Sequence, residues 1–318
     1  MSKYALSIDM GATTAKCVIF KGNDIIGDFV VETKTMNSLV VNIKTRFVAK
    51  CIELDIKPKK LSFVALAVCG IIDPVTEKVI FSANLNIKDY DIKSEFQKEF
   101  EVKNVSVMND AKAAVYGEWA SAYKRKPNSM MMYTIGTGIG GGIILNKALI
   151  LGDSSGLPSE PGHGGGFQTK YKCNCGLDGC LEAAASATAI ELQINEVARK
   201  STSELGNLYK ELGRDLTIKD INPLFNNNNK EVKDIFIEAL EPLAKQIAII
   251  QHVLDAEIFV IGGGPSLLGE ELVNIIKNHI DKYILNDFGK HLDVQISKTG
   301  FSSGTLGAFE FAKERFKY

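Results

Sequence analysis

The chain has 318 residues, of which 45% are hydrophobic, and its 37 basic side chains nearly balance its 38 acidic ones. This length suggests about two domains, and the near-zero net charge provides no strong field for holding nucleic acid or an anionic membrane as a partner. The N-terminus enters a strand directly, with no basic region followed by a long apolar stretch, so the sequence predicts a cytoplasmic protein without a signal peptide or membrane anchor.

The N-terminal part of the sequence predicts a strand meander followed by alternating helices and strands. Short apolar runs separated by small or polar turn residues indicate the strands, and longer stretches with helical spacing indicate the helices. The predicted elements are strands at 3–9, at 15–20 and up to Val31, a helix up to about Leu54, strands at 62–68 and 106–108, and a helix at 111–122. The last two strands end on Cys69-Gly70 and on Asn109-Asp110.

The same pattern restarts at Met130. Residues 7–20, S-I-D-M-G-A-T-T-A-K-C-V-I-F, and residues 133–145, Y-T-I-G-T-G-I-G-G-G-I-I-L, both predict strand, Gly/Thr turn and strand. Their separation of roughly one domain length indicates an internal duplication. The later predicted elements are strands at 130–134 and 143–145 around a turn at 136–142, helices at about 183–200, 235–254 and 267–285, an Asn-rich loop at 226–229, a strand at 258–261 and a last helix from about Gly304.

Three cysteines and a histidine lie close together in residues 160–182, E-P-G-H-G-G-G-F-Q-T-K-Y-K-C-N-C-G-L-D-G-C-L-E. Four such soft ligands close a tetrahedral zinc site and leave no position for water, so the metal would be structural. A disulfide between two cysteines this close in sequence is disfavoured by its geometry. Glu160 and Glu182 flank the motif, and a bound zinc would fix both carboxylates. The candidate ligands are His163, Cys173, Cys175 and Cys180.

Two turns without bulky side chains expose backbone N–H groups that can hold phosphate. In the first, Asp9 can hold hydrated magnesium, and the hydroxyls and ammonium that follow can contact phosphate oxygens. Taken singly, each turn is more simply a hairpin turn, but two at equivalent places in a duplicated unit favour a polyphosphate held between two domains. The candidate residues are Asp9, Gly11, Thr13, Thr14 and Lys16 in the first turn and Gly136, Thr137 and Gly138 in the second.

Asp110 has both a structural and a functional interpretation. Aspartate is a good N-cap, and Asp110 lies at the start of a predicted helix. The carboxyl end of a strand is also where α/β proteins place site residues. The position alone does not decide between them.

Three motifs together closely resemble the ROK family of bacterial sugar kinases and repressors: N-D-A-K-A-A-V-Y-G-E at 109–118, G-T-G-I-G-G-G at 136–142, and the zinc loop with its flanking acids. The resemblance covers essentially the whole chain. It implies an actin-like, ribonuclease H-like pair of α/β domains of duplicated βββαβαβα type, with ATP and sugar in the cleft. These domains would comprise residues 1–120 plus 304–318 and residues 121–303, with the zinc loop at about 160–182, and the protein would be a homodimer.

The resemblance also implies the reaction and the roles of single residues. Asp110 would be the catalytic base, accepting the proton of a sugar hydroxyl as it attacks the γ-phosphate of ATP. The cofactors would be ATP with Mg²⁺ and structural Zn²⁺, and the substrate a glucose-like hexose phosphorylated at the 6-hydroxyl. The implied sugar-binding residues are Gly70, Asn84, Asn109, Glu160, His163 and Glu182, while Gly262, Gly263 and Gly264 would lie against adenosine.

The sequence departs from the family pattern in several places. Ala12 replaces a usual glycine, Lys112 stands where asparagine is frequent, Pro161 stands where an aliphatic residue is usual, and residues 86–92 match poorly. These differences leave the identity of the sugar substrate undecided. Repressors of the family carry a helix-turn-helix domain before the kinase-like part, whereas the first predicted strand here begins at about Lys3. We therefore expect a kinase rather than a sugar-responsive regulator or a non-catalytic sugar-binding protein.

Overall fold

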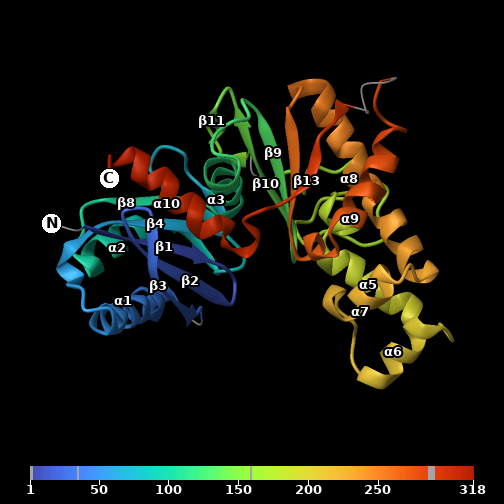
Figure 1. The fold of residues 1–318 in the computed structure, drawn as a ribbon, viewed down its shortest axis with the longest axis horizontal. Helices are drawn as coiled ribbons and strands as arrows, with labels where there is room; N and C mark the ends of the chain where they lie inside the picture. The colour runs from blue at the N-terminus through green and yellow to red at the C-terminus, as the bar shows by residue number, and fades with distance from the viewer. Residues whose placement is uncertain (1–2, 34–35, 158–159, 286–290) are drawn as a thin grey trace. The chain divides into compact units, whose positions relative to one another are not determined.

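The computed structural model describes residues 3–33, 36–157, 160–285 and 291–318, and its fold divides into two compact units. The first unit contains residues 1–128, 142–159 and 298–318, and the second contains residues 129–141 and 160–297. The first unit contains one five-stranded sheet, and three strands of a second five-stranded sheet lie wholly in the second unit (Figure 1). In the described part of the chain, no helix is long and apolar enough to cross a membrane. The domain limits expected from the sequence stay a prediction.

The sheet of the first unit has the strand order β3-β2-β1-β4-β8. Its strands are β1 (Tyr4–Met10), β2 (Thr14–Lys21), β3 (Asp24–Glu32), β4 (Leu61–Val68) and β8 (Val105–Asn109). The first three form an antiparallel meander, as the sequence predicts, and β4 and β8 run parallel to β1. The carboxyl ends of β1, β4 and β8 are in register, with Met10 beside Val68 and Val68 beside Asn109.

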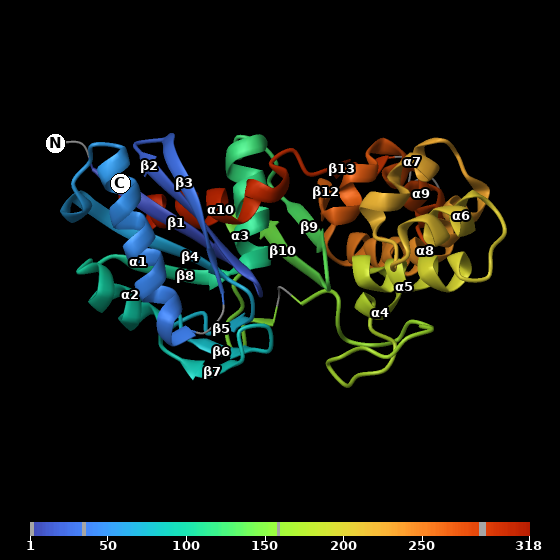
Figure 2. The same ribbon diagram turned by 90° about the horizontal axis from the view of Figure 1, so that it is seen from below.

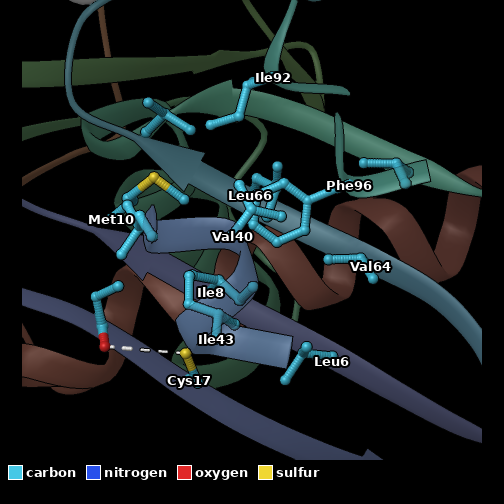
Figure 3. Close-up of a cluster of buried hydrophobic side chains, with 14 of the residues drawn as sticks. Leu6, Ile8, Met10, Cys17, Val40, Ile43, Val64, Leu66, Ile92 and Phe96 are labelled. Atoms are coloured by element: carbon cyan, nitrogen blue, oxygen red, sulfur yellow. Dashed lines mark hydrogen bonds between the residues drawn. The ribbon is translucent and has the colours of Figure 1, made fainter. Parts of the chain in front are cut away.

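Helices cover both faces of this sheet (Figure 1). Alternate strand residues point to opposite faces, so Leu6 and Ile8 pack with Val40 of α1 (Met36–Glu53) and Phe96 of α2 (Ile92–Phe100), as Figure 3 shows. On the other face, Ala5 packs with Phe309 of α10 (Ser303–Arg315), and α10 lies against α3 (Asp110–Gly117).

A second, smaller sheet in the first unit was not expected from the sequence. It consists of β5 (Ile71–Ile72), β6 (Val79–Ser82) and β7 (Ile87–Tyr90), in that order (Figure 2). It lies between β4 and α2 in the chain. The segment 86–92, which matches the family pattern poorly, therefore contains a complete strand.

The other five-stranded sheet repeats the strand order of the five-stranded sheet in the first unit. It runs β11-β10-β9-β12-β13, so that in both sheets the third, second and first strands are followed by the fourth and fifth. Its strands are β9 (Met130–Ile135), β10 (Ile139–Leu145), β11 (Ala148–Leu149), β12 (Ile258–Gly263) and β13 (Val294–Ile296). β12 is parallel to β9 and β13, and the boundary between the units falls within β10. This repetition is what the predicted duplication requires.

Most of the remaining chain in the second unit is helical. Its helices are α4 (Glu182–Ala185), α5 (Ala187–Ala198), α6 (Glu204–Leu212), α7 (Ile218–Asn226), α8 (Lys230–Leu254) and α9 (Glu270–Ile280). Residues 227–229 separate α7 from α8, within the predicted Asn-rich loop at 226–229. Short 3₁₀ segments occur at Pro58–Lys60, Gly264–Leu268 and Gly300–Ser302, and α3 continues into a π-helical turn at Glu118–Ala122.

The prediction that residues 136–142 form one long turn is wrong, because β10 already begins at Ile139. The glycines of this strand are explained by neighbours that fill the space of a side chain. A Cβ on Gly141 would lie 2.6 Å from Cγ of Pro161, and a Cβ on Gly142 would lie 2.3 Å from Cγ1 of Val115.

Several predicted helices have different limits, and the one expected at 235–254 begins at Lys230. The helix expected at about 183–200 is divided at Ser186, whose backbone is extended and whose hydroxyl accepts a hydrogen bond from the Ala189 N–H at 3.1 Å. The helix expected at 267–285 ends at Ile280 and begins only at Glu270. Gly269 precedes it with a φ of 69°, which is incompatible with a continuous helix through this point.

Candidate functional site

The predicted site residues of the first unit follow the carboxyl ends of its three parallel strands. Asp9 lies near the end of β1, Gly70 follows β4, and Asn109 and Asp110 mark the end of β8. Because these strands are neighbours in the sheet, the fold brings the polar groups together at one edge. This is the edge at which parallel α/β sheets bind ligands.

The capping interpretation of Asp110 is wrong, because Asn109 is the N-cap of α3. The side-chain oxygen of Asn109 accepts a hydrogen bond from the Lys112 N–H at 3.0 Å, and its amide nitrogen donates to the Gly70 carbonyl at 2.9 Å. The Asp110 carboxylate accepts a hydrogen bond from the neighbouring Ala111 N–H at 2.9 Å. Desolvation raises the pKa of Asp110. Asp110 is therefore available for another role at the helix start.

Asp9 is a second perturbed carboxyl group at this edge. Burial, and after it the negative charge of Asp110, raise the pKa of Asp9 to about 6, while Lys16 opposes the shift. A Cβ on Gly304, in the first turn of α10, would lie 2.6 Å from Oδ2 of Asp9. The contact of Gly304 with Asp9 was not predicted from the sequence, where the available signal is a glycine in the first turn of a helix.

The turn between β1 and β2, which the sequence predicts to bind phosphate, is short and exposed. The Gly11 N–H donates to the Thr14 carbonyl at 3.0 Å, and both Ala12 and Thr13 are exposed between them. Ala12 is not among the described non-glycine residues with positive φ, so its methyl group imposes no backbone strain on the turn. Lys16 is exposed on β2 directly opposite Asp9 in the strand ladder.

Lys112 and Asn84 occupy very different surroundings in the first unit. Lys112 is buried, and its ammonium donates to the carbonyls of Leu151 and Gly156 at 2.6 and 2.9 Å. It therefore ties α3 to the segment after β11. Asn84 is exposed in the turn between β6 and β7.

The glycine turns of the second unit lie at the ends of adjacent parallel strands. Gly136 and Gly138 follow β9, while Gly262 and Gly263 end β12, with Gly263 directly opposite Ile135. A Cβ on Gly263, whose φ is 91°, would lie 2.0 Å from the Ile135 carbonyl oxygen. In contrast, Gly264 has open space around it, and Thr137 is exposed. The two predicted nucleotide-binding segments are thus neighbours.

The four candidate metal ligands converge in the second unit. One ligand atom from each of His163, Cys173, Cys175 and Cys180 lies within 4.8 Å of all the others. Two of these spacings, Cys173 Sγ to His163 Nδ1 and Cys175 Sγ to Cys180 Sγ, are 3.6 Å. A zinc ion with Zn–S bonds of about 2.3 Å in tetrahedral geometry places neighbouring sulfurs about 3.8 Å apart. The donor set and its spacing therefore fit zinc.

The two flanking carboxylates lie in different surroundings. Oε2 of Glu160 is 3.8 Å from Nε2 of His163, on the opposite side of the ring from the nitrogen that faces Cys173. A bound metal would therefore leave an N–H of His163 facing the carboxylate. Oε2 of Glu182 accepts a hydrogen bond from the Ile139 N–H at 2.9 Å. This contact joins the end of the cysteine motif to the turn at Gly136–Ile139, and it was not predicted from the sequence.

Comparison with known proteins finds relatives over nearly the whole chain. The ROK family model matches residues 5–315. A glucokinase of Thermotoga maritima is 30% identical, with 98% of this chain and 97% of the relative covered. An N-acetylmannosamine kinase of Haemophilus influenzae is 26% identical, with 97% and 95% covered. The solved structure of a ROK family glucokinase from Streptomyces griseus, in complex with glucose and AMPPNP, matches with a TM-score of 0.85 at 24% identity, covering 98% of this chain and 99% of that one.

Proposed function

The chain belongs to the ROK family, and we infer that it is an ATP-dependent hexose kinase with the actin-like fold of its relatives. The observation that carries this inference is the position of Asp110. It is a desolvated carboxyl group at the carboxyl end of a parallel strand, and a different residue caps the helix that follows. A general base needs such a group within reach of the proton that it accepts.

In the first unit, we propose that Asp110 accepts the proton of the sugar hydroxyl as that oxygen attacks the γ-phosphate. The open turn after Asp9 offers N–H groups, the hydroxyls of Thr13 and Thr14 and the Lys16 ammonium to phosphate oxygens. Phosphoryl transfer depends mainly on such positioning and charge stabilisation. Mg²⁺ bound with ATP would neutralise phosphate charge, and the raised pKa of Asp9 fits a carboxylate that is normally paired with a cation.

In the second unit, we propose that Glu160, His163 and Glu182 bind sugar hydroxyls and that the two glycine segments bind the nucleotide. Carboxylates accept hydrogen bonds from hydroxyls, while an imidazole N–H donates one. His163, Cys173, Cys175 and Cys180 would hold Zn²⁺, which supplies a fixed scaffold for these side chains. With four protein ligands the zinc has no open position for substrate.

We propose a glucose-like hexose, including N-acylated or β-glucoside forms, as the substrate, with the 6-hydroxyl as acceptor. The test is release of ADP, measured by a coupled assay with glucose, N-acetylmannosamine, mannose, fructose, allose and β-glucosides. The expected result is turnover on at least one of them with magnesium present. Sugar binding without ADP release from any of them would instead support a non-catalytic sugar-binding protein. Salt-sensitive DNA binding that responds to sugar would support a regulator.

The metal prediction can be tested through Cys175, the exposed member of the four ligands. Cys175→Ser should lose zinc, because hydroxyl is a poor substitute for thiolate, and should weaken sugar binding because Glu160 and Glu182 are no longer fixed. Metal content by elemental analysis and sugar affinity by calorimetry check both effects. Cys51→Ala, in the buried part of α1, is the control that should keep its zinc. Unchanged metal content and sugar affinity in Cys175→Ser would contradict the assignment.

We also propose a cytoplasmic homodimer. All six cysteines are free thiols in the structure, which fits a reducing compartment. Light scattering of the purified protein measures the oligomeric state directly.

A further inference from the structure

The carboxylate of Glu182 lies inside the turn at Gly136–Ile139. Its Oε2 accepts the Ile139 N–H at 2.9 Å, and a Cβ built on Gly138 would lie only 2.0 Å from the same oxygen. The carboxylate therefore occupies the space that any side chain at position 138 would need. Because Ile139 is buried, its N–H would otherwise be shielded from water without an acceptor.

The rest of the turn is held by the same part of the chain. The Gly136 carbonyl accepts the Ala187 N–H at 2.9 Å, at the start of α5, and the Glu182 N–H donates to the Gly162 carbonyl at 2.9 Å. A Cβ on Gly162 would lie 2.3 Å from the Ile139 carbonyl oxygen. Both ends of the cysteine motif thus pack against the turn, and the Glu182 contact is made by a charged side chain.

The same carboxylate also faces the candidate metal cluster. Its other oxygen, Oε1, is 3.6 Å from Sγ of Cys173, and Glu182 is separated from Cys180 by a single residue. One side chain therefore contacts both a metal-ligating sulfur and the backbone of the turn. Displacement of the cysteine loop would move this carboxylate and remove the acceptor from the Ile139 N–H.

We propose that Glu182 is a positioning residue for the Gly136–Ile139 turn, through which the metal loop sets nucleotide affinity in addition to sugar affinity. This inference rests on the proposed function, in which the turn binds the phosphates of ATP. Glu182 keeps the turn in the conformation that presents Thr137 and its neighbouring backbone N–H groups. A role for Glu182 limited to sugar hydroxyls would leave nucleotide binding in the absence of sugar unaffected.

The test measures the affinity of Mg²⁺-ADP by calorimetry without any sugar. Glu182→Ala should weaken this affinity about tenfold or more, because it removes a charged hydrogen-bond acceptor from a buried N–H. Glu182→Gln keeps an acceptor oxygen and should show a smaller loss. Glu160→Gln is the matched control, since the Glu160 carboxylate lies 3.8 Å from Nε2 of His163, near the other end of the cysteine motif, and is proposed to bind the sugar; its nucleotide affinity without sugar should stay within twofold of wild type. Removal of the zinc bound by the cysteine motif should weaken nucleotide affinity in wild type and have little further effect in Glu182→Ala.

Hydrogen exchange of a peptide covering residues 133–142 provides a readout that needs no nucleotide. Exchange in this peptide should be faster in Glu182→Ala and unchanged in Glu160→Gln, with circular dichroism showing that both variants are folded. Equal nucleotide affinity and equal exchange in wild type and both Glu182 variants would overturn the proposal. Wild type could bind no nucleotide while the peptide covering residues 133–142 exchanges faster in Glu182→Ala. In that case the positioning role of Glu182 would stand, and the assignment of the turn as a nucleotide-binding site would be wrong. Should Glu182→Ala fail to fold, the comparison of Glu182→Gln with Glu160→Gln decides the outcome.

Discussion

Asp110→Asn should lower kcat by about a thousandfold, within the roughly 10²- to 10⁴-fold range that general acid–base catalysis contributes. The amide that replaces the carboxylate cannot accept the proton of the attacking hydroxyl. Sugar affinity should change little, because the substitution is isosteric and the contact with the Ala111 N–H needs only an oxygen acceptor. Steady-state kinetics, together with calorimetry of sugar binding, separates the two effects.

The structure indicates that this variant will fold. Asn109, which caps α3 and is bonded to Gly70, is untouched by the change. Asp24→Asn, an exposed aspartate at the start of β3, is the matched control and should leave kcat unchanged. A kcat for Asp110→Asn within a few-fold of wild type would show that another group is the base.

The same assignment predicts a pH dependence. A base must be deprotonated to accept a proton, and desolvation raises the pKa of Asp110. The pKa of Asp9 is also raised, to about 6. As pH falls through about 6 the Asp9 carboxylate becomes protonated, and Asp110 is protonated at a higher pH than an ordinary aspartate, so kcat/KM should decline on the acid side above the ordinary aspartate value of about 4. A profile that stays flat down to pH 4.5 would contradict an essential role for either group.

Most of the fold could be predicted because local patterns and the duplicated turn point to the same architecture. The meander of β1, β2 and β3, the strands β4, β8, β9 and β12, and the helix after Asn109 follow from apolar runs that end on small or polar residues. The smaller sheet was missed because its strands are short. β5 has two residues, and β6 and β7 have four each, which is too few to establish an alternating pattern.

The candidate site was harder to predict wherever a glycine or a polar side chain acts through a distant neighbour. The metal ligands could be identified because their chemistry and spacing are distinctive, and they do converge. The Glu182 contact with Ile139 joins residues 43 positions apart, and local sequence patterns do not report such pairs. For the same reason, glycines at 141 and 142 were assigned to a turn, although the space that they leave is filled by Pro161 and Val115.

Gly307→Ala should be strongly destabilising, because α3 and α10 approach each other through their backbones. A Cβ on Gly307 would lie 1.7 Å from the Ala113 carbonyl oxygen, and a Cβ on Gly117 would lie 2.3 Å from the Ser303 carbonyl oxygen. These are backbone atoms, so no side-chain rotation can relieve the overlap, and one helix must move away from the other. We expect the free energy of unfolding to fall by about 3 kcal/mol or more, which is at the upper end of the usual destabilisation caused by overpacking.

Thermal unfolding measures this loss, and a loss of about 3 kcal/mol corresponds to a fall in Tm of about 4 to 5 °C in a chain of 318 residues, at an unfolding entropy of about 2.1 cal/mol/K per residue. Gly213→Ala is the control. Gly213 ends α6 with a φ of 60° and has no atom within 4 Å of its Cβ position, so alanine there meets backbone strain of about 1 kcal/mol and no overlap. A Tm for Gly307→Ala equal to that of the control would mean that the helices separate easily. α3 begins at Asp110, and α10 begins beside Asp9. A separation of the two helices that is large enough to admit the methyl group should therefore also lower kcat at temperatures at which the protein is still folded.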